Sequence, residues 1–525
     1  MNRFNILSRR AFLSRNFKLS MGIALSTLLD VPLVLKRALA EGSIGLNGKK
    51  VLFIFLRGAN DGVNALIPIL DPGYLSARPN TGSNIGIPPD PGANYAATTG
   101  GCPYPTLTSP YAHTYAIPLG NGFAALHPSL MYLGPVYNAG DLALIHRVAY
   151  PKQSRSHFDS QNYWESGNPN NNLVKDGIFY RTMVASGLAG SSPLTGVSIQ
   201  SALPLLLRGR AAAMTNLTDP TRYDLLGIPN TTAGNAKTEA AFRAANWYPF
   251  PDKASREMLQ LQYQNLVNTL SVFSGIDFTE TGNNYLDPDT GFNLFPTTSG
   301  KNQGQVDSGA YSFIKNIKAA ALILNRTSAI VAGTELGGFD THQNQGGTTG
   351  TQANLLRRVG WAIYGLRQYF LNHADQATWN NVVIVTLSEF GRTSVQNGSL
   401  GTDHAEAGLM FVAGGMVRGY GKGNTFGVFN CGLSDPIAWT PGLRDPNPNV
   451  CGTLWGAAPT VVQGYLKRCT DYRSVLGEII RKHLGATQDQ LNWIIPGYAN
   501  AGECLLTGGT SSSDSTPITG EVGIL

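Results

Sequence analysis

Residues 49–62 read KKVLFIFLRGANDG, and this stretch decides the expected fold. Six apolar residues stand in a row without the polar alternation of a half-exposed strand, so they predict a strand buried on both faces of a parallel sheet. Asp61-Gly62 then marks a turn at the carboxyl end of that strand. Similar apolar runs predict three more strands, at 142–150 (LALIHRVAY), 328–336 (SAIVAGTEL) and 380–393 (NNVVIVTLSEFGRT).

Helical patterns separate these strands, near 129–140, 310–325, 352–372 and 471–484. Strands that alternate with helices predict the α/β class, here a doubly wound, mostly parallel sheet with helices on both faces. We expect a single domain over 41–506 with long irregular insertions near 72–118 and 205–308, which are rich in Gly, Asn, Thr and Pro. Residues 507–525 are rich in Gly, Ser and Thr and predict a flexible tail.

The first 40 residues carry seven Lys or Arg and one Asp, which accounts for the whole formal net charge of +6. The rest of the chain is balanced, so no electrostatic surface for nucleic acid is expected. SRRAFLSR (8–15), a moderately apolar stretch and ALA (38–40) are typical of a cleavable twin-arginine signal; a basic amphipathic helix is the alternative. We expect a signal peptide over 1–40, the twin-arginine translocation machinery as a partner, and export to the periplasm or surface of a bacterium.

The sequence lacks two further features, a long apolar run and a cysteine pair typical of zinc sites, and this limits the kinds of protein that it can encode. No run of 18 or more apolar residues follows the N-terminal segment, so no internal transmembrane helix is expected. The five cysteines are widely spaced and form no Cys-x-x-Cys pair, so a cysteine-based zinc site has no support, although disulfides are compatible with export.

Polar side chains follow each predicted strand at its carboxyl end, and such ends share one edge of a parallel sheet. Three of the eight histidines fall in this group, which predicts a site for a divalent cation at that edge. Oxygen and imidazole ligands suit zinc, manganese, magnesium, calcium or iron, without deciding between them. The candidates, in chain order, are Asp61, Ser156 with His157 and Asp159, Asp340 with His342, Glu389 with Arg392, and Asp403 with His404.

The chemistry expected of this group is hydrolysis of a charged ester. A cation beside the Ser156 hydroxyl would activate it as a nucleophile, and Arg392 or Arg155 would clamp the substrate oxygens. Other interpretations of the same residues remain open. Asp61 is also suited to a turn, Ser156 to a helix cap, Asp159 to a first helical turn, and Glu389 with Arg392 to a structural ion pair.

Six stretches together resemble the DUF1501 family of uncharacterised proteins: FLRGANDGVNALIP (55–68), LHPSL (126–130), SRSHFDSQNYWESG (154–167), GGFDTHQNQ (337–345), SEFGRT (388–393) and GTDHAEAG (401–408). That family in turn resembles the alkaline phosphatase–sulfatase superfamily, with a doubly wound α/β core and a two-metal site. The resemblance implies that one metal ion is bound by Asp61, Ser156 and Glu389, and the other by Asp340, His342 and His404. Substrate contacts would then fall to Arg155, His157 and Asp403.

The leading functional expectation is therefore an exported, metal-dependent hydrolase of phosphate or sulfate esters, acting on a small molecule or a glycan with one or two divalent ions. Ser388-Glu389 stands where that superfamily usually has Asp-His. This substitution favours the other hypothesis, a non-catalytic cell-envelope binding or scaffold protein that retains the fold.

Overall fold

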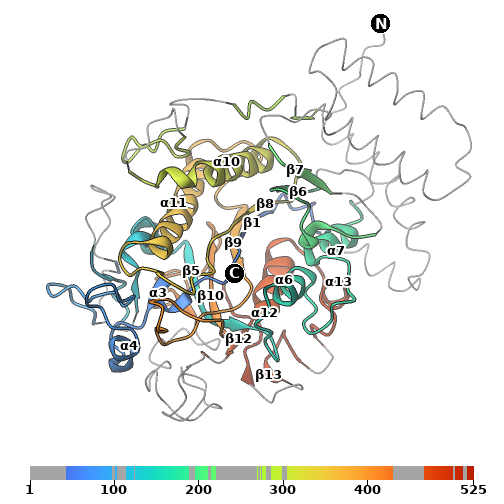
Figure 1. Ribbon diagram of the computed structural model, residues 1–525. Coiled ribbons are helices and arrows are strands. Elements are labelled where there is room, and N and C mark those ends of the chain that lie inside the picture. Colours follow the sequence, from blue (N-terminus) through green and yellow to red (C-terminus); the bar gives the residue numbers. More distant parts are fainter. Residues whose placement is uncertain are drawn as a thin grey trace, which may run out of the picture.

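A mixed sheet of nine described strands forms the centre of the molecule, as Figure 1 shows for the computed structural model. Its strand order is β11 (Val428–Phe429), β5 (Leu142–Ala149), β10 (Gly408–Ala413), β9 (Val382–Ser388), β1 (Lys50–Leu56), β8 (Val331–Leu336), β6 (Gly196–Ile199) and β7 (Thr215–Leu217), with β12 (Thr470–Asp471) beside β5. The structure describes residues 43–96, 101–102, 114–122, 124–188, 195–210, 214–219, 269, 272–273, 275–279, 285–297, 304–429, 466, 468–499, 503–511 and 517–525.

The apolar run within residues 49–62 forms the central strand, β1. β1 pairs in parallel with β8 on one side and with β9 on the other, so that Val51 lies opposite both Val331 and Val383. All seven residues of β1 are buried, as expected for a strand covered on both faces. The predicted α/β class and the mostly parallel sheet are confirmed.

β10 runs antiparallel to both of its neighbours, β5 and β9, and this was not anticipated. Its apolar run lacks a long helix before it, because only a loop connects it to β9. The reversed direction has a consequence for the site. The amino end of β10 lies at the same edge as the carboxyl ends of β1, β5, β8 and β9, so the loop before β10 is brought to that edge.

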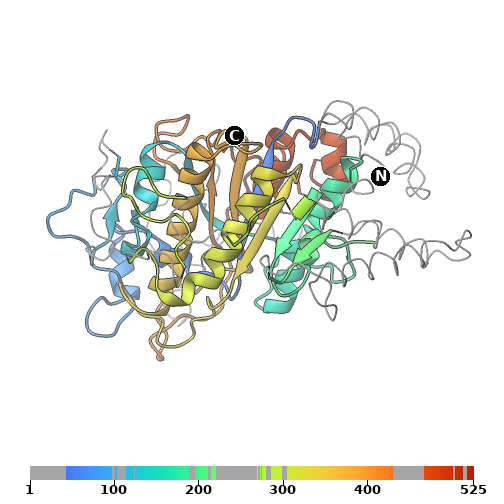
Figure 2. The same cartoon turned by 90° about the horizontal axis from the view of Figure 1, so that it is seen from above.

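Helices cover both faces of the sheet (Figures 1 and 2). Alternate residues of β1 separate two cores: Leu52, Ile54 and Leu56 belong to one cluster, and Val51, Phe53 and Phe55 to the other. The first cluster includes α5 (Leu133–Asn138), α10 (Tyr311–Arg326) and α11 (Thr351–Asn372). The second includes α7 (Ile178–Ala185), α12 (Tyr472–Glu478), α13 (Gln488–Ile494) and part of α6 (His157–Ser166).

Shorter elements complete the described chain. They are α3 (Gly62–Ala65), α4 (Pro72–Ala77), the small sheet of β2 (Leu66–Ile67), β4 (Ala125–Leu126) and β3 (Ile117–Pro118), the short helices η1 (Pro128–Leu130), η3 (Leu205–Leu207), η4 (Ser308–Ala310) and η6 (Ile479–His483), and the pair β13 (Gly509–Thr510) and β14 (Pro517–Ile518). None of the helices that the structure describes is both long and apolar enough to span a lipid bilayer.

Two expectations about irregular segments differ from the structure. The insertion near 72–118 contains α4 and β3, and it contributes buried side chains such as Tyr74. The end of the chain was expected to be loose, but Ile524 is fully buried and its carbonyl accepts a hydrogen bond from the amide of Arg418. The expected signal peptide over 1–40 and most of the insertion near 205–308 lie outside the described residues.

Two buried histidines predict that the fold loses stability in mild acid. Burial lowers the pKa of His127 and of His483 to about 4, from an ordinary value of 6.5. Ser129 donates to Nδ1 of His127 and its Nε2 faces the Gly347 carbonyl, so the neutral ring is the one that fits. Between pH 6.5 and about 4 the unfolded chain therefore binds more protons than the native one, and stability falls as pH falls.

The expected loss is about 1.4 kcal/mol per pH unit for each histidine in that window. Urea unfolding midpoints between pH 7 and pH 4.5 measure it. His483→Gln keeps a side-chain donor for the Lys50 carbonyl, which accepts from His483 at 2.9 Å, but cannot titrate. Its stability should change less steeply with pH than that of the wild type; equal slopes would contradict the prediction.

Candidate metal centre

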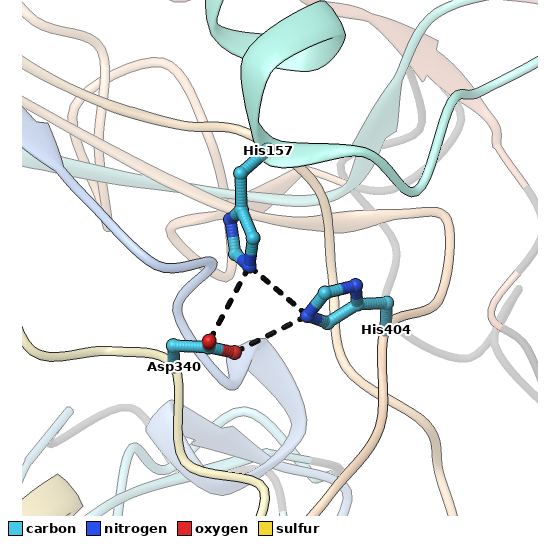
Figure 3. A group of neighbouring side chains, drawn as sticks. All are labelled: His157, Asp340 and His404. Carbon is cyan, nitrogen blue, oxygen red and sulfur yellow. Dashed lines mark hydrogen bonds and ion pairs between the residues drawn. The ribbon is translucent and has the colours of Figure 1, made fainter.

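Three side chains converge at the carboxyl edge of the sheet: His157, Asp340 and His404 (Figure 3). The Nε2 atoms of the two histidines are 3.0 Å apart. The Asp340 oxygens lie 3.2 Å from Nε2 of His404 and 3.5 Å from Nε2 of His157. Atoms that each lie about 2.1 Å from one cation are themselves about 3.0–3.4 Å apart, so this spacing fits the coordination sphere of a transition-metal ion.

The three residues come from segments that the sheet brings together. Asp340 follows β8, and His157 opens α6 in the connection that follows β5. His404 lies in the loop before β10, where a short antiparallel bridge to Arg392 holds it beside the end of β9. The edge predicted from the parallel strands is therefore the edge at which these side chains meet.

The second nitrogen of His404 fixes the direction of its lone pair. Nδ1 lies 2.8 Å from the carbonyl oxygen of Arg155, which can only accept a hydrogen bond, so Nδ1 carries the proton. Nε2 is then unprotonated and presents its lone pair to His157 and Asp340. A ligand histidine is commonly oriented in this way, by a backbone carbonyl or a carboxylate on its far nitrogen.

His342 extends the group on the other side of His404. Its Nε2 lies 2.9 Å from Nε2 of His404 and 3.2 Å from Oδ1 of Asp340. Its Nδ1 lies 2.9 Å from Oδ1 of Asp403, which also accepts from Asn397. Asp403, expected to contact substrate, therefore orients His342 instead.

Glu389 was expected to bind metal directly, and the structure places it behind His157. Its carboxylate accepts hydrogen bonds from the Gly58 amide at 2.8 Å and from Gln161 at 2.7 Å. Oε1 lies 3.8 Å from Nδ1 of His157, an ion-pair distance on the side of the ring opposite Nε2. With its oxygens occupied and its side chain fully buried, Glu389 supports a ligand instead of being one.

Arg392 was expected to clamp substrate, but its guanidinium is fully buried below the cluster. It donates to the carbonyl oxygens of Gly58, Ala59, Phe339 and Thr402 and contacts Oδ1 of Asp340 at 2.5 Å. These acceptors belong to loops after β1 and β8 and before β10. Arg392 thus ties the three loops together and orients Asp340. The interpretation of Glu389 and Arg392 as an ion pair is wrong, because Arg392 pairs with Asp340 and the Glu389 oxygens accept from Gly58 and Gln161.

Asp61 was expected to bind metal, and the structure places it in another network. Its carboxylate pairs with Arg78 through contacts of 2.6 and 3.0 Å, and both side chains are fully buried. It also accepts from Gln345 and from the first amides of α3. Asp61 therefore has a structural role, as the turn interpretation expected, but it plays this role as the N-cap of α3 and as the partner of an arginine from the insertion near 72–118.

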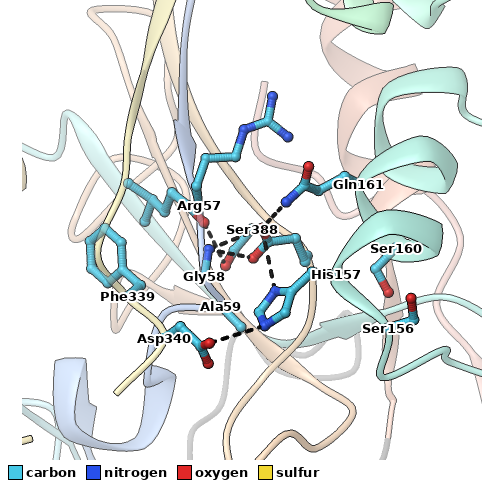
Figure 4. A network of polar contacts seen from close by, with 12 residues as sticks. Arg57, Gly58, Ala59, Ser156, His157, Ser160, Gln161, Phe339, Asp340 and Ser388 are labelled. Atoms are coloured by element: carbon cyan, nitrogen blue, oxygen red, sulfur yellow. Dashed lines mark hydrogen bonds and ion pairs between the residues drawn. The ribbon is translucent and has the colours of Figure 1, made fainter. Parts of the chain in front are cut away.

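Ser156 is the N-cap of α6, as the helix-cap interpretation of this residue predicts. Its hydroxyl accepts from the amide of Asp159 at 3.4 Å, the residue is exposed, and Figure 4 shows it on the Ser160 side of the helix start, away from Asp340. Asp159 is the first-turn acid of that helix. Arg155 is also exposed, and its carbonyl oxygen contacts the cluster through Nδ1 of His404.

The charges of the cluster are set by these neighbours. Burial would raise the pKa of Asp340, but the Arg392 guanidinium and the histidines outweigh it and lower that pKa to about 2. The nearby Glu389 carboxylate raises the pKa of His157, while burial opposes it. Burial, with Arg392 and His157, lowers the pKa of His404. The site thus combines an ionised carboxylate with a His404 ring that remains neutral, both suited to hold a cation.

Two supporting residues were not anticipated. Gln161 lies one helical turn after His157 on α6, and its position four residues later in HFDSQ is the sequence signal that places both on one face. Gly58 has φ of 104°, and a Cβ at this position would lie 2.4 Å from the backbone nitrogen of Asp340. Glycine there permits the close approach of the loops after β1 and β8.

Comparison with known proteins bears on part of this region. Residues 297–430 match the model of a family described as a protein of unknown function (DUF1501). This segment runs from before α10 to β11 and contains Asp340, His342, Glu389, Arg392 and His404, whereas His157 lies outside it. The match supports the resemblance to that family over this segment. No curated protein matches the chain.

Proposed function

We propose that this chain is an exported, metal-dependent hydrolase of phosphate or sulfate esters, with its reaction centre at His157, Asp340 and His404. The single observation that carries the proposal is the convergence of their Nε2 and carboxylate atoms. Unprotonated imidazole nitrogens 3.0 Å apart repel one another unless a cation or a proton lies between them. With Nδ1 of His404 donating to the Arg155 carbonyl, its Nε2 is free to accept, and we propose that a cation, held also by the ionised Asp340, lies there instead of a proton from His157.

The donor set favours some of the expected ions over others. Magnesium, calcium and manganese prefer oxygen ligands, whereas imidazole suits zinc and iron. With two to three imidazoles and one carboxylate, we propose zinc or iron and disfavour the other three ions. A divalent ion bound here would supply Lewis acidity and make water a better nucleophile near neutral pH.

The protein's own residues hold and expose the reaction centre. Arg392 keeps Asp340 ionised, and Glu389 and the Arg155 carbonyl direct the lone pairs of His157 and His404 into the site. The side chains of Asp340 and His404 are 47% and 23% exposed, so an ester group can reach them. Because the Ser156 hydroxyl is turned to a backbone amide, we propose water as the nucleophile in place of the serine.

The proposal of export is supported by the N-terminal sequence and by a disulfide bond. Cys469 is disulfide-bonded, and structural disulfides persist in oxidising compartments such as the periplasm. The pattern SRRAFLSR in residues 8–15 supports the twin-arginine route, which carries folded proteins.

The proposal predicts metal-dependent turnover that does not need Ser156. Protein purified from cells without chelator is analysed for metal and assayed with 4-nitrophenyl phosphate, bis(4-nitrophenyl) phosphate and 4-nitrophenyl sulfate. His404→Ala should lower turnover by at least about 100-fold, whereas Ser156→Ala should retain it.

The remaining outcomes are informative. Loss of turnover in Ser156→Ala with metal content unchanged would make the serine the nucleophile. Stoichiometric metal without hydrolysis of any ester would favour the non-catalytic envelope binding protein.

A further inference from the structure

A solvent-facing side of α6 lies directly beside the candidate metal centre. Phe158 follows His157 in the chain, and its side chain is 87% exposed, although large aromatic residues are usually covered. His157 and Gln161 use one side of this helix to reach Glu389. Phe158 and Asn162, also four residues apart, share the neighbouring side.

Polar side chains around Phe158 are held in place by one another. Asn172 donates to Oδ1 of Asp159 at 2.8 Å and accepts from Asn162 at 3.0 Å. The loop that carries Asn172 is anchored to the strand-β5 connection, because Asn170 donates to the Pro151 carbonyl at 2.8 Å. An exposed aromatic ring thus stands next to an arranged set of amide and carboxylate groups.

We infer that this surface, defined by Phe158, Asp159, Asn162 and Asn172, is a carbohydrate subsite, and that the ester substrate is carried on a glycan. That the glycan carries an ester rests on the proposed hydrolase function, whereas the binding of sugar does not. A sugar ring offers an apolar C–H face that packs on an aromatic ring and hydroxyl groups that pair with amides and carboxylates. A protein contact fits less well, because the cores of such interfaces are depleted in Asp.

The position of the surface also fits an extended ligand. Phe158 directly follows His157, a proposed ligand of the cation. Because consecutive Cα atoms are about 3.8 Å apart, the Phe158 side chain is attached to the chain close to that ligand. Lys175 donates to the carbonyl of Asn172 at 3.0 Å and places a positive charge at the rim. A sulfated or phosphorylated sugar could therefore hold its ester group at the cation and its ring on Phe158.

Binding of the metal-loaded full chain to immobilised polysaccharides tests the inference. The panel contains carrageenan, fucoidan, chondroitin sulfate and phosphomannan, each with its unesterified form. Phe158→Ala should weaken binding about tenfold, since covering a large apolar side chain contributes about one such factor. Phe158→Trp should restore it, and Leu371→Ala, which truncates a 46% exposed apolar side chain on α11, should have no effect.

Several results would overturn the inference: no binding to any member of the panel, equal binding by Phe158→Ala, or self-association that Phe158→Ala abolishes while no glycan binds. Its failure is distinguishable from failure of the proposed function. Glycan binding that depends on Phe158 without any hydrolysis leaves the subsite intact and removes the enzyme. Hydrolysis of aryl esters without Phe158-dependent glycan binding would support the enzyme and rule out the subsite.

Discussion

Replacing Asp340 with Asn is expected to abolish tight binding of zinc, lowering the affinity by more than about 100-fold. Asp340 supplies the only anionic oxygen among the three converging residues, and its carboxylate lies within 3.5 Å of both imidazoles. A cation bound by the native state stabilises it by about 2.7 kcal/mol at 100 times the dissociation constant. The wild type should therefore unfold at a higher urea concentration when zinc is added, and Asp340→Asn should not.

Two variants sharpen this measurement. Glu389→Gln changes a residue behind His157, so it should weaken binding by about 10–100-fold, which is less than the loss of a ligand. Asp159→Asn makes the same change of charge in the first turn of α6 and should leave the affinity unaltered. Unfolding of each metal-free variant controls for damage to the fold. Zinc binding retained in Asp340→Asn would show that Asp340 is not a ligand, and absence of zinc binding by the wild type would show that the histidines share protons and hold no cation.

Replacing Asp61 with Asn is expected to destabilise the fold by about 3–5 kcal/mol without changing the metal content of the folded protein. Asn keeps a side-chain oxygen for the amides of α3 but leaves the Arg78 guanidinium with an uncompensated charge. Both side chains are 0% exposed, so water cannot replace the lost partner. Denaturant midpoints measure the destabilisation, and metal analysis at low temperature measures occupancy.

The double variant Asp61→Leu with Arg78→Met separates charge from volume. Removing both charges should recover part of the lost stability, but not all of it, because Arg78 also donates to the Thr393 and Ser394 carbonyls. The result that contradicts this account is a folded Asp61→Asn protein that has lost its metal, since that would make Asp61 a ligand.

The strands and the edge at which side chains meet could be predicted from the sequence. Continuous apolar runs identified β1, β5, β8 and β9, and the polar residues that follow them placed His157, Asp340 and His404 at one edge. The direction of β10 could not be inferred, because the GLMFVA run of 408–413 is compatible with either orientation. That direction depends on which neighbours it pairs with.

The roles of individual acids were the least predictable part. Asp61 and Asp340 both follow buried strands. Only the packed structure shows that Asp61 pairs with Arg78, whereas Asp340 faces the histidines. Glu389 lies behind His157 and does not face the site, because Gly58 and Gln161 bind its oxygens. Sequence spacing does not encode such a choice between the two sides of an imidazole ring.

His157 and His404 are separated by 247 residues along the chain, and they meet only when β5, β8, β9 and β10 are all in register. Closing loops of this size is slow, and a truncated or nicked chain that lacks either segment cannot complete the pair. Occupancy of the cation would consequently report whether a given molecule has matured, and nascent chains on the ribosome would stay empty until synthesis passes the later histidine.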